Sequence, residues 1–439
     1  MKANNIFKKE ISLKSIARFW LISILLFLPF QLRIIQDNTL SSKFSIFLQY
    51  LDELTIVIFL PLAIQELFRR KIKPDFFCLL PVYMIAVFSA AGFISGIVNA
   101  NKILITVLGT FDYLKNFLVI FIYAAFFTDQ KDFNKIWHLV FAIGIFLGLV
   151  AFTQEIWSLT ARYILGRSIY ERGVYFLGVA SMAIEDCWRL GLYRAAALTC
   201  HPNSLGLYSL LILAVYLFKE KKINFWIFFA FFSGVFFSVS RINYLGFVFL
   251  CALQILKTGR RWIAACIIPV IILLIFMSRM PDLKEKGETD FRTYTKQKAL
   301  ETWKDNLLLG AGPGMFGGVI SITFHSPLYK KYGFSQHWYD YMQSLKCLDQ
   351  FWPQALAETG IIGSAIFSGL LISLFLLFLT AHKRVQNAEI KGLFSALIVG
   401  VVFIFIYSLG YSLNATLFLF TFSAFAGVVL GNYESSNYK

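Results

Sequence analysis

Charged residues are scarce in this chain: only 15% of its 439 residues are Asp, Glu, Lys or Arg, whereas 58% are hydrophobic. A soluble domain of this size carries more charge and separates its apolar faces from its polar ones. Here apolar runs recur from end to end, each about as long as the 20 residues that a helix needs to cross a bilayer core of roughly 30 Å. Because backbone groups in lipid must be hydrogen-bonded within their own segment, we expect these runs to be helices. The composition therefore predicts an all-α integral membrane protein.

Two kinds of motif are also missing. The sequence has no Asp-x-Asp, His-Glu-x-x-His or Cys-x-x-Cys pattern, so we expect neither a catalytic metal nor a cofactor. No small-x-small cleavage site follows Pro29 in the first apolar run. We therefore interpret this run as an uncleaved first helix rather than as a signal peptide.

The apolar runs predict about twelve transmembrane helices. We place them at residues 17–36, 48–67, 77–98, 103–127, 135–156, 203–218, 223–240, 242–257, 262–279, 355–380, 391–409 and 412–430. The whole chain, residues 1–439, is then a single polytopic membrane domain with two long extracytoplasmic loops. The first loop covers residues 158–203, and the larger second loop covers residues 280–353 and contains short helices, for example at 294–305.

The net charge of +16 lies largely in short clusters between the apolar runs, which indicates membrane topology rather than a nucleic-acid partner. With the N-terminus in the cytoplasm, most Lys and Arg of the short connections fall on the cytoplasmic side. They lie in the N-terminal tail and in segments 69–73, 131–135, 219–222, 257–261 and 383–391. This bias predicts a multi-pass protein of the inner (plasma) membrane with both termini in the cytoplasm.

Arginine without lysine supplies the positive charge of the first loop, in Arg162, Arg167, Arg172, Arg189 and Arg194. Guanidinium is a planar fork that matches phosphate oxygens and stays charged. The set therefore indicates either a phosphorylated ligand or contact with lipid headgroups. Arg241 lies in a very short outer turn between two apolar runs, where its charge faces a polar cavity or reaches the membrane surface.

In the second loop, Arg292 opens a helix-like stretch that leads to the glycine cluster 310–314. The cluster lacks the Lys-Ser/Thr of a phosphate-binding P-loop, so a structural turn is the favoured interpretation. Asp349 precedes the next helix, where it is either a helix cap or a reactive carboxylate. Glu358 lies within the apolar run that follows, and we expect it to lock the helix bundle through hydrogen bonds.

Asp112 and Lys115 are three residues apart in the expected helix 103–127, so they share one face. An ionisable pair inside the membrane is a functional candidate, but a structural ion pair is the favoured interpretation. Cys187 and Cys200 lie in or at the end of the first loop, and the sequence leaves open whether they form a disulfide.

Over about residues 189–375, the sequence resembles the O-antigen ligase and O-antigen polymerase superfamily of bacterial membrane glycosyltransferases. The motifs that carry the resemblance are Arg194 with Pro202-Asn203, Ser240-Arg241, Arg292 with the glycine cluster, and Asp349-Gln350 followed by Glu358-Thr359-Gly360 and Gly363. Each motif is short, and their order within a twelve-helix frame is more specific than any one of them.

The resemblance implies a fold of GT-C type and transfer of a glycan from an undecaprenyl-pyrophosphate carrier. It implies that Arg194, Arg241 and Arg292 bind the pyrophosphate and that Asp349 is the catalytic base. Candidate accessory residues are Arg189, His337, Gln350 and Lys115. The ligase branch usually has a histidine where this chain has Asp349, so the resemblance favours the polymerase branch.

The expected function is that of an O-antigen polymerase, which joins lipid-linked oligosaccharide repeats by inverting, metal-independent glycosyl transfer on the extracytoplasmic face. One alternative is a ligase that transfers the glycan to lipid A-core. A transporter of the same lipid-linked oligosaccharide is a further alternative, less favoured because the candidate residues gather at the outer face. The expected partners are the undecaprenyl-pyrophosphate-linked oligosaccharide and membrane lipid, with a chain-length regulator protein as a candidate and no nucleic acid.

Overall fold

The computed structural model describes residues 13–35, 42–70, 76–163, 188–189, 192–199, 201–220, 223–258, 270–271, 275, 291–345, 350–413 and 416–437. The elements along the chain are α1 (Leu13–Ile35), α2 (Ser42–Gln49), α3 (Leu51–Arg69), α4 (Phe76–Val98), α5 (Ile103–Phe126), α6 (Gln130–Tyr163), β1 (Trp188–Arg189), β2 (Leu192–Tyr193), α8 (Pro202–Lys219), α9 (Phe225–Phe236), α10 (Arg241–Thr258), α12 (Phe291–Asp305), α13 (Val319–Thr323), α14 (Pro327–Lys331), α15 (Gln336–Leu345), α16 (Phe351–Arg384), α17 (Ala388–Ser408) and α18 (Thr416–Asn437). The two short strands pair antiparallel, with Trp188 opposite Tyr193.

Local sequence signals explain where several helices begin. Pro202 opens α8, and a first-turn proline fits there because its missing N–H has no partner inside a helix. The side-chain oxygen of Asn224 accepts a hydrogen bond from Trp226 N at 2.9 Å at the start of α9. Asn387 does the same for Glu389 N at 2.9 Å at the start of α17. Such caps satisfy amides that the helix itself leaves unbonded.

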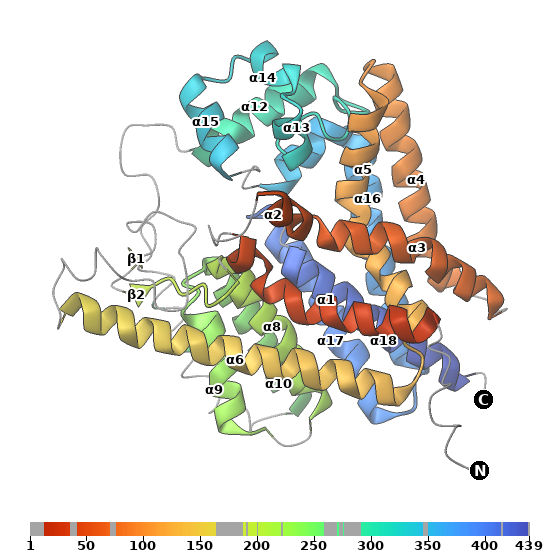
Figure 1. Cartoon of the computed structure of the whole chain (residues 1–439), viewed down its shortest axis with the longest axis vertical. Helices are drawn as coiled ribbons and strands as arrows, with labels where there is room; N and C mark the ends of the chain where they lie inside the picture. Colours follow the sequence, from red (N-terminus) through yellow and green to blue (C-terminus); the bar gives the residue numbers. More distant parts are fainter. Residues whose placement is uncertain are drawn as a thin grey trace, which may run out of the picture.

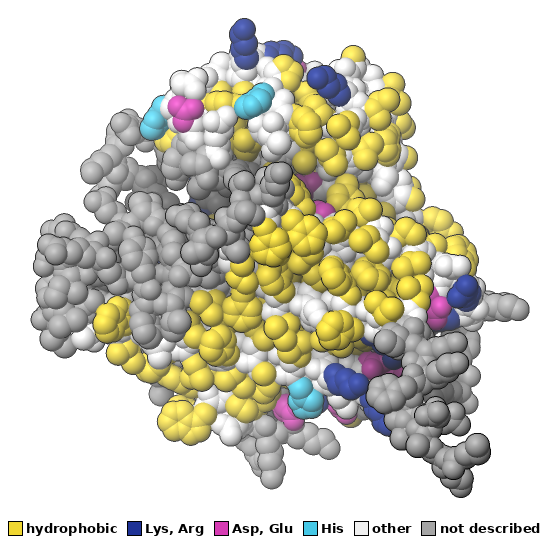
Figure 2. All heavy atoms as spheres, viewed as in Figure 1, with side chains coloured by type: hydrophobic (Ala, Val, Ile, Leu, Met, Phe, Trp, Pro, Cys, Tyr) yellow, Lys and Arg dark blue, Asp and Glu magenta, His cyan; other side chains and the backbone are white. Residues whose placement is uncertain are grey.

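Among the described residues, seven helices are long and apolar enough to cross a membrane: α1, α4, α5, α6, α8, α16 and α17. Shorter apolar stretches occupy α9, α10 and the Leu417–Tyr433 part of α18. Figure 2 shows a broad hydrophobic band across the middle of one face, with Lys and Arg toward its two ends. The fold is therefore that of an all-α integral membrane protein.

Eleven of the twelve helices expected from the sequence coincide with helices in the described part of the chain. The twelfth, expected at 262–279, lies outside the described residues except for 270–271 and 275. Helix α6 continues to Tyr163, beyond Ser158, where the first loop is expected to start. Ser158 is fully buried and Gln154 exchanges hydrogen bonds with the backbone of Ala197, so polar packing extends this helix beyond its apolar run.

The helix ends sort into two sets at opposite ends of the bundle. At one end, ion pairs join Lys14 to Glu66 at 3.8 Å and Arg18 to Asp132 at 3.0 Å. Helices α12 to α15 lie at the other end, beside the upper part of α5 (Figure 1). We call residues 291–345 the cap. The second loop of the sequence thus contains ordered short helices, as its aromatic and glycine content predicted.

Close helix contacts place α5 at the centre of the fold. Gly427 and Gly431 of α18 face α5, and a Cβ atom on Gly427 would lie 2.3 Å from the carbonyl oxygen of Ile120. Two small residues four positions apart let two helix backbones approach closely in a membrane. Helix α3 also packs on α5, and α4 packs on both α5 and α16. These contacts fix α5 and α16, which together carry the polar residues of the candidate site.

Candidate active site at the cap end

The glycine cluster 310–314 is a structural turn that docks the cap on α16. The amide nitrogen of Ala311 donates to the carbonyl of Ala357, and that of Gly312 donates to the carbonyl of Glu358, each at 2.8 Å. The turn needs glycine because Gly310 and Gly312 have φ angles of +68° and +104°. With two of its amides already bonded to α16, the cluster does not form a phosphate cradle. This confirms the structural interpretation drawn from the sequence.

Helix α16 opens locally to receive this turn. Gly360 has φ 64° and ψ −166°, which interrupts the helix. The amides of Ile361 and Ile362 then donate to the carbonyls of Leu307 and Leu308 at 3.0 and 3.1 Å. The cap and the membrane helix therefore exchange backbone hydrogen bonds in place of those that the helix loses.

Glu358 closes the same junction from inside the bundle. Its side chain is 1% exposed. Its carboxylate accepts hydrogen bonds from the Tyr113 hydroxyl and from Phe316 N, both at 2.7 Å, and from Gln354 Nε2 at 3.5 Å. A buried carboxylate with several donors holds its surroundings in one arrangement. The contacts support the locking role expected for Glu358.

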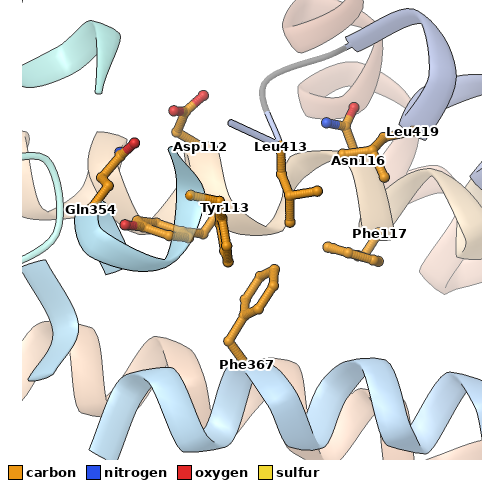
Figure 3. A pocket seen from close by; sticks show the side chains of 9 residues that line it. Asp112, Tyr113, Asn116, Phe117, Gln354, Phe367, Leu413 and Leu419 are labelled. Carbon is orange, nitrogen blue, oxygen red and sulfur yellow. The ribbon is translucent and has the colours of Figure 1, made fainter. Parts of the chain in front are cut away.

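A recess lies between α5, the first turns of α16 and the turn before α18. Its lining residues are Asp112, Tyr113, Asn116, Phe117, Phe351, Gln354, Phe367, Leu413 and Leu419. Figure 3 shows the polar tips of Asp112 and Gln354 on one side and the rings of Phe117 and Phe367 on the other. We call this hollow the α5–α16 recess. It combines polar groups with aromatic faces, as ligand sites commonly do.

Lys115 joins the wall of this recess to α3. Its ammonium nitrogen lies 2.8 Å from Asp112 Oδ1 and 2.8 Å from Glu53 Oε1. Asp52, next to Glu53, is 2% exposed. The ion pair expected between Asp112 and Lys115 is confirmed, and Glu53 is a partner that sequence reasoning missed because it comes from a helix far away in the chain.

Arg241 and Arg292 approach the turn between α17 and α18 from two different elements. The guanidinium carbon of Arg292 lies 5.0 Å from the ring centroid of Tyr411. Ile242, the neighbour of Arg241, lies against Gly410, where an added Cβ would be 2.6 Å from Ile242 Cδ1. The starts of α10 and α12 are 50 residues apart in the sequence. They therefore lie against two adjacent residues of one turn, Gly410 and Tyr411. That turn continues to Leu413, which lines the recess.

Arg194 lies deeper than the other two arginines. It is 3% exposed, and its Nη2 atom lies 3.4 Å from Asn203 Oδ1. Its backbone neighbour Ala195 donates to the carbonyl of Phe237 at 2.8 Å, just before the turn that leads to Arg241. Arg194 and Glu155 are both within electrostatic range of the Tyr244 hydroxyl. Arg194 is thus built into the wall near α10, with a buried acidic residue nearby.

The remaining candidates are spread around this region. His337 is exposed on α15, with its ring centroid 4.8 Å from that of Trp338. Gln350 is half-buried and immediately precedes α16. The side chain of Arg189 and the whole of Asp349 lie outside the described residues, as do Cys187 and Cys200. The structure therefore brings the starts of α10 and α12, which carry Arg241 and Arg292, to the turn beside the recess. His337 makes no described contact there.

Within the cap, a second apolar core holds these elements in place. Its buried members are Phe291, Ala299, Phe316, Ile322, Tyr329, Met342 and Ala357. The Tyr329 hydroxyl accepts a hydrogen bond from Gly317 N at 2.9 Å and lies 2.6 Å from Ser321 Oγ. Burial raises the pKa of Tyr329, so its hydroxyl keeps its proton. Phe291 fixes the start of α12 and so positions its neighbour Arg292.

Residues 225–368 match the family model described as O-antigen ligase. This domain supports the resemblance of the chain to the O-antigen ligase and polymerase superfamily. The matched stretch begins at α9, includes the whole cap and ends within α16, so it contains Arg241, Arg292 and Gln350 but neither Arg194 nor Lys115. No curated protein matches the chain.

This O-antigen ligase domain confirms the resemblance at the level of the superfamily. The matched family indicates a glycosyltransferase-like membrane enzyme of polysaccharide synthesis that acts on lipid-linked oligosaccharides.

Proposed function

We propose that this protein is an O-antigen or polysaccharide polymerase that joins undecaprenyl-pyrophosphate-linked oligosaccharide repeats. A hydroxyl oxygen of one repeat attacks the anomeric carbon of the growing chain, and the bond from that carbon to the pyrophosphate breaks. Undecaprenyl pyrophosphate leaves and the glycan grows by one repeat. A single displacement of this kind inverts the anomeric configuration, in contrast to the two-step reaction of retaining glycosidases.

The observation that carries the proposal is that the starts of α10 and α12, which carry Arg241 and Arg292, lie against one turn beside the α5–α16 recess. Arg292 lies over Tyr411, and the residue after Arg241 contacts Gly410. Two guanidinium groups at one turn can stabilise the charge that develops on a departing pyrophosphate. Arg194 is the third proposed pyrophosphate residue, and its near-complete burial suits a long-range electrostatic role rather than direct contact.

Asp349 is the proposed base that removes the proton from the attacking hydroxyl. The next described residues, Gln350 and Phe351, lead directly into the recess, since Phe351 and Gln354 line it. One base is sufficient here because pyrophosphate is already a good leaving group and needs its charge stabilised rather than a proton. No step of this scheme requires a metal ion.

One argument favours polymerisation over ligation, and a separate argument orients the enzyme in the membrane. The sequence has Asp349 at the position where the ligase branch usually has histidine. The start of α1, where Lys14 and Arg18 pair with Glu66 and Asp132, lies away from the cap. We therefore place both termini in the cytoplasm and the active site on the extracytoplasmic face of the inner membrane. A chain-length regulator would then meet the protein at the cap end.

The test uses the full-length protein in nanodiscs with purified undecaprenyl-pyrophosphate-linked repeats, and the products are separated by size. Wild type should form chains of several repeats, and Asp349→Asn should form none. Asp340→Asn is the matched control, because Asp340 is an exposed cap carboxylate that accepts a hydrogen bond only from Gln336 in the described part of the chain. It should retain wild-type chain length.

In cells, deletion should leave single repeats on the lipid core. Accumulation of long polymer on the carrier lipid would instead identify a ligase and reject the polymerase. Polymer of normal length from Asp349→Asn would reject Asp349 as the base. Movement of intact lipid-linked repeats across the membrane without any coupling would identify a transporter.

A further inference from the structure

A buried asparagine, Asn243, joins the two stretches that carry Arg194 and Arg241. It lies in the first turn of α10, two residues after Arg241, and its side chain is 0% exposed. Its Nδ2 atom donates to Ser238 Oγ at 3.0 Å and to the carbonyl of Asn203 at 3.4 Å. Asn203 belongs to the first turn of α8, and its side-chain oxygen accepts the hydrogen bond from Arg194 Nη2 at 3.4 Å. One amide group therefore links the turn before Arg241 to the residue that holds Arg194.

The contact between α8 and α10 leaves this amide little room to move. The two helices lie side by side (Figure 1). A Cβ atom at Gly206 of α8 would lie 1.9 Å from Asn243 Nδ2 and 2.8 Å from Ser238 Oγ. Glycine at this position leaves space for the asparagine, so the amide lies directly against the backbone of α8. Packing therefore reinforces the link that the hydrogen bonds make.

The turn that leads into Arg241 is held in a strained conformation. Val239 is fully buried and has a φ of 41°, a left-handed value that a β-branched residue rarely adopts. Both of its neighbours are tied to other elements: the carbonyl of Phe237 accepts from Ala195 N at 2.8 Å, and Ser238 Oγ accepts from the asparagine amide. Such strain persists only where the surroundings fix it, and it is concentrated at functional sites. The turn therefore holds the start of α10 in one place.

An amide at position 243 is not what stability alone would favour. Asn243 Oδ1 has no hydrogen-bond partner among the described residues, and a buried acceptor without a partner lowers stability. Leucine has nearly the same shape and would avoid this cost. Residues that break a rule of stable packing are expected at functional sites. The unpartnered oxygen therefore indicates that the role of Asn243 goes beyond folding.

We propose that Asn243 is a positioning residue for the donor pyrophosphate, because it fixes Arg194 and Arg241 relative to each other. The inference rests on the proposed function, in which these two arginines stabilise the lipid diphosphate. Asn243 acts through them and takes no part in the reaction itself. Guanidinium groups that are already in place need no rearrangement as charge develops on the departing pyrophosphate. Loss of the link should therefore weaken binding of the diphosphate and leave binding of the acceptor unchanged.

The experiment uses the full-length protein in nanodiscs and measures calorimetric binding of undecaprenyl pyrophosphate together with rates of transfer. The acceptor is the repeat on an alkyl lipid that cannot act as a donor. Asn243→Leu keeps the shape of the side chain and removes both hydrogen bonds. It should raise the Kd for undecaprenyl pyrophosphate and the donor KM about tenfold, and change the acceptor KM less than about twofold. Its Tm should be at least that of wild type, because the unpartnered oxygen is gone.

A second pair of variants separates positioning from packing. Gly206→Ala should displace the amide, and so lower the Tm and raise the Kd for undecaprenyl pyrophosphate. Adding Asn243→Ala makes room for the new methyl group and should restore most of the Tm but not the affinity. This double variant decides the question if Asn243→Leu does not fold.

The matched control is a similar contact between α4 and α5. Thr106 is 2% exposed, its Oγ1 atom has no partner among the described residues, and a Cβ at Gly96 would lie 2.4 Å from that atom. Thr106→Val removes the unpartnered oxygen without a change of shape, and Gly96→Ala disturbs the packing. The first should keep the wild-type Tm or raise it, the second should lower it, and neither should change the Kd for undecaprenyl pyrophosphate.

Binding by the wild type separates this inference from the polymerase assignment. If wild type binds undecaprenyl pyrophosphate and a folded Asn243→Leu binds it more weakly, the positioning role holds even if the enzyme proves to be a ligase. If both bind it equally, the positioning role is overturned and the proposed function stands. If affinity returns together with Tm in the Gly206→Ala, Asn243→Ala double variant, Asn243 acts through packing alone and the proposal is also overturned. A wild-type protein that does not bind undecaprenyl pyrophosphate would reject both.

Discussion

Arg292 lies with its guanidinium carbon 5.0 Å from the ring centroid of Tyr411. The contact joins the cap, through α12, to the turn between α17 and α18. Tyr411 stacks in turn on Tyr407, with ring centroids 5.2 Å apart. An arginine over a stacked aromatic pair loses little further freedom when it binds an anion, since its plane is already oriented. Tyr411 thus acts as a positioning residue for the proposed pyrophosphate site.

The ring of Tyr411, and not its hydroxyl, should set donor affinity. Tyr411→Leu removes the cation–π contact and should raise the donor KM roughly threefold to tenfold, while Tyr411→Phe keeps the ring and should stay within about twofold of wild type. Initial rates against donor concentration measure both. A control at the opposite end is Tyr433→Leu, where Tyr433 packs on Phe394. Equal effects of Tyr411→Leu and Tyr411→Phe would contradict the positioning role.

The planar shape of the Arg292 side chain should matter as much as its charge. Lysine keeps the charge but loses the fork that binds two phosphate oxygens, so Arg292→Lys should lower kcat/KM for the donor by about tenfold to a hundredfold. Arg384→Lys, on an exposed site at the far end of α16, should change it less than about twofold. Steady-state kinetics with the lipid-linked donor provide the measurement. Full activity in Arg292→Lys would remove this residue from the pyrophosphate site.

The docking of the cap should depend on a glycine with no room for a side chain. A Cβ at Gly310 would lie 2.4 Å from the carbonyl of Glu358, in addition to the cost of its φ of +68°. Gly310→Ala should therefore destabilise the protein by about 3 kcal/mol or more. Gly333 has φ +61° with no atom within 4 Å, so Gly333→Ala should show only the backbone cost of about 1 kcal/mol. Thermal unfolding compares them, and equal shifts would refute the close docking.

Much of the fold was predictable because each membrane helix corresponds to a continuous apolar run in the sequence. An apolar run of sufficient length must form its hydrogen bonds within itself, so sequence alone located eleven helices that the structure describes. The glycine cluster was also readable as a turn, from the missing P-loop Lys-Ser/Thr. The end of α6 was not readable, because Gln154 and Ser158 are polar residues whose partners come from other segments.

The candidate site was predictable residue by residue but not as an assembly. Arg241 and Arg292 stand out as charges at helix starts, whereas the aromatic residue that holds Arg292 has no local signal. Asn116 looks like any polar residue in an apolar helix until the neighbouring elements leave its oxygen without a partner. These arrangements depend on contacts between residues far apart in the sequence. One example is the contact of Glu53 with Lys115, which are separated by 62 residues.

Removal of the Lys115 charge should lower the free energy of unfolding more than removal of most other cations of the bundle. Its two partners are largely shielded from solvent, with side-chain exposures of 17% for Asp112 and 23% for Glu53. Lys115→Met leaves both carboxylates without their cation and should lower the free energy of unfolding by about 3–5 kcal/mol. Lys219 provides the comparison, because its partners Glu220 and Glu389 are 41% and 45% exposed and Lys219→Met should cost less than about 1 kcal/mol.

Adding Glu53→Gln and Asp112→Asn to Lys115→Met should recover most of the loss, since the site is then neutral. Thermal unfolding in detergent measures all three variants against wild type. A triple variant no more stable than Lys115→Met would show that Lys115 contributes through packing of its methylene chain rather than through its charge.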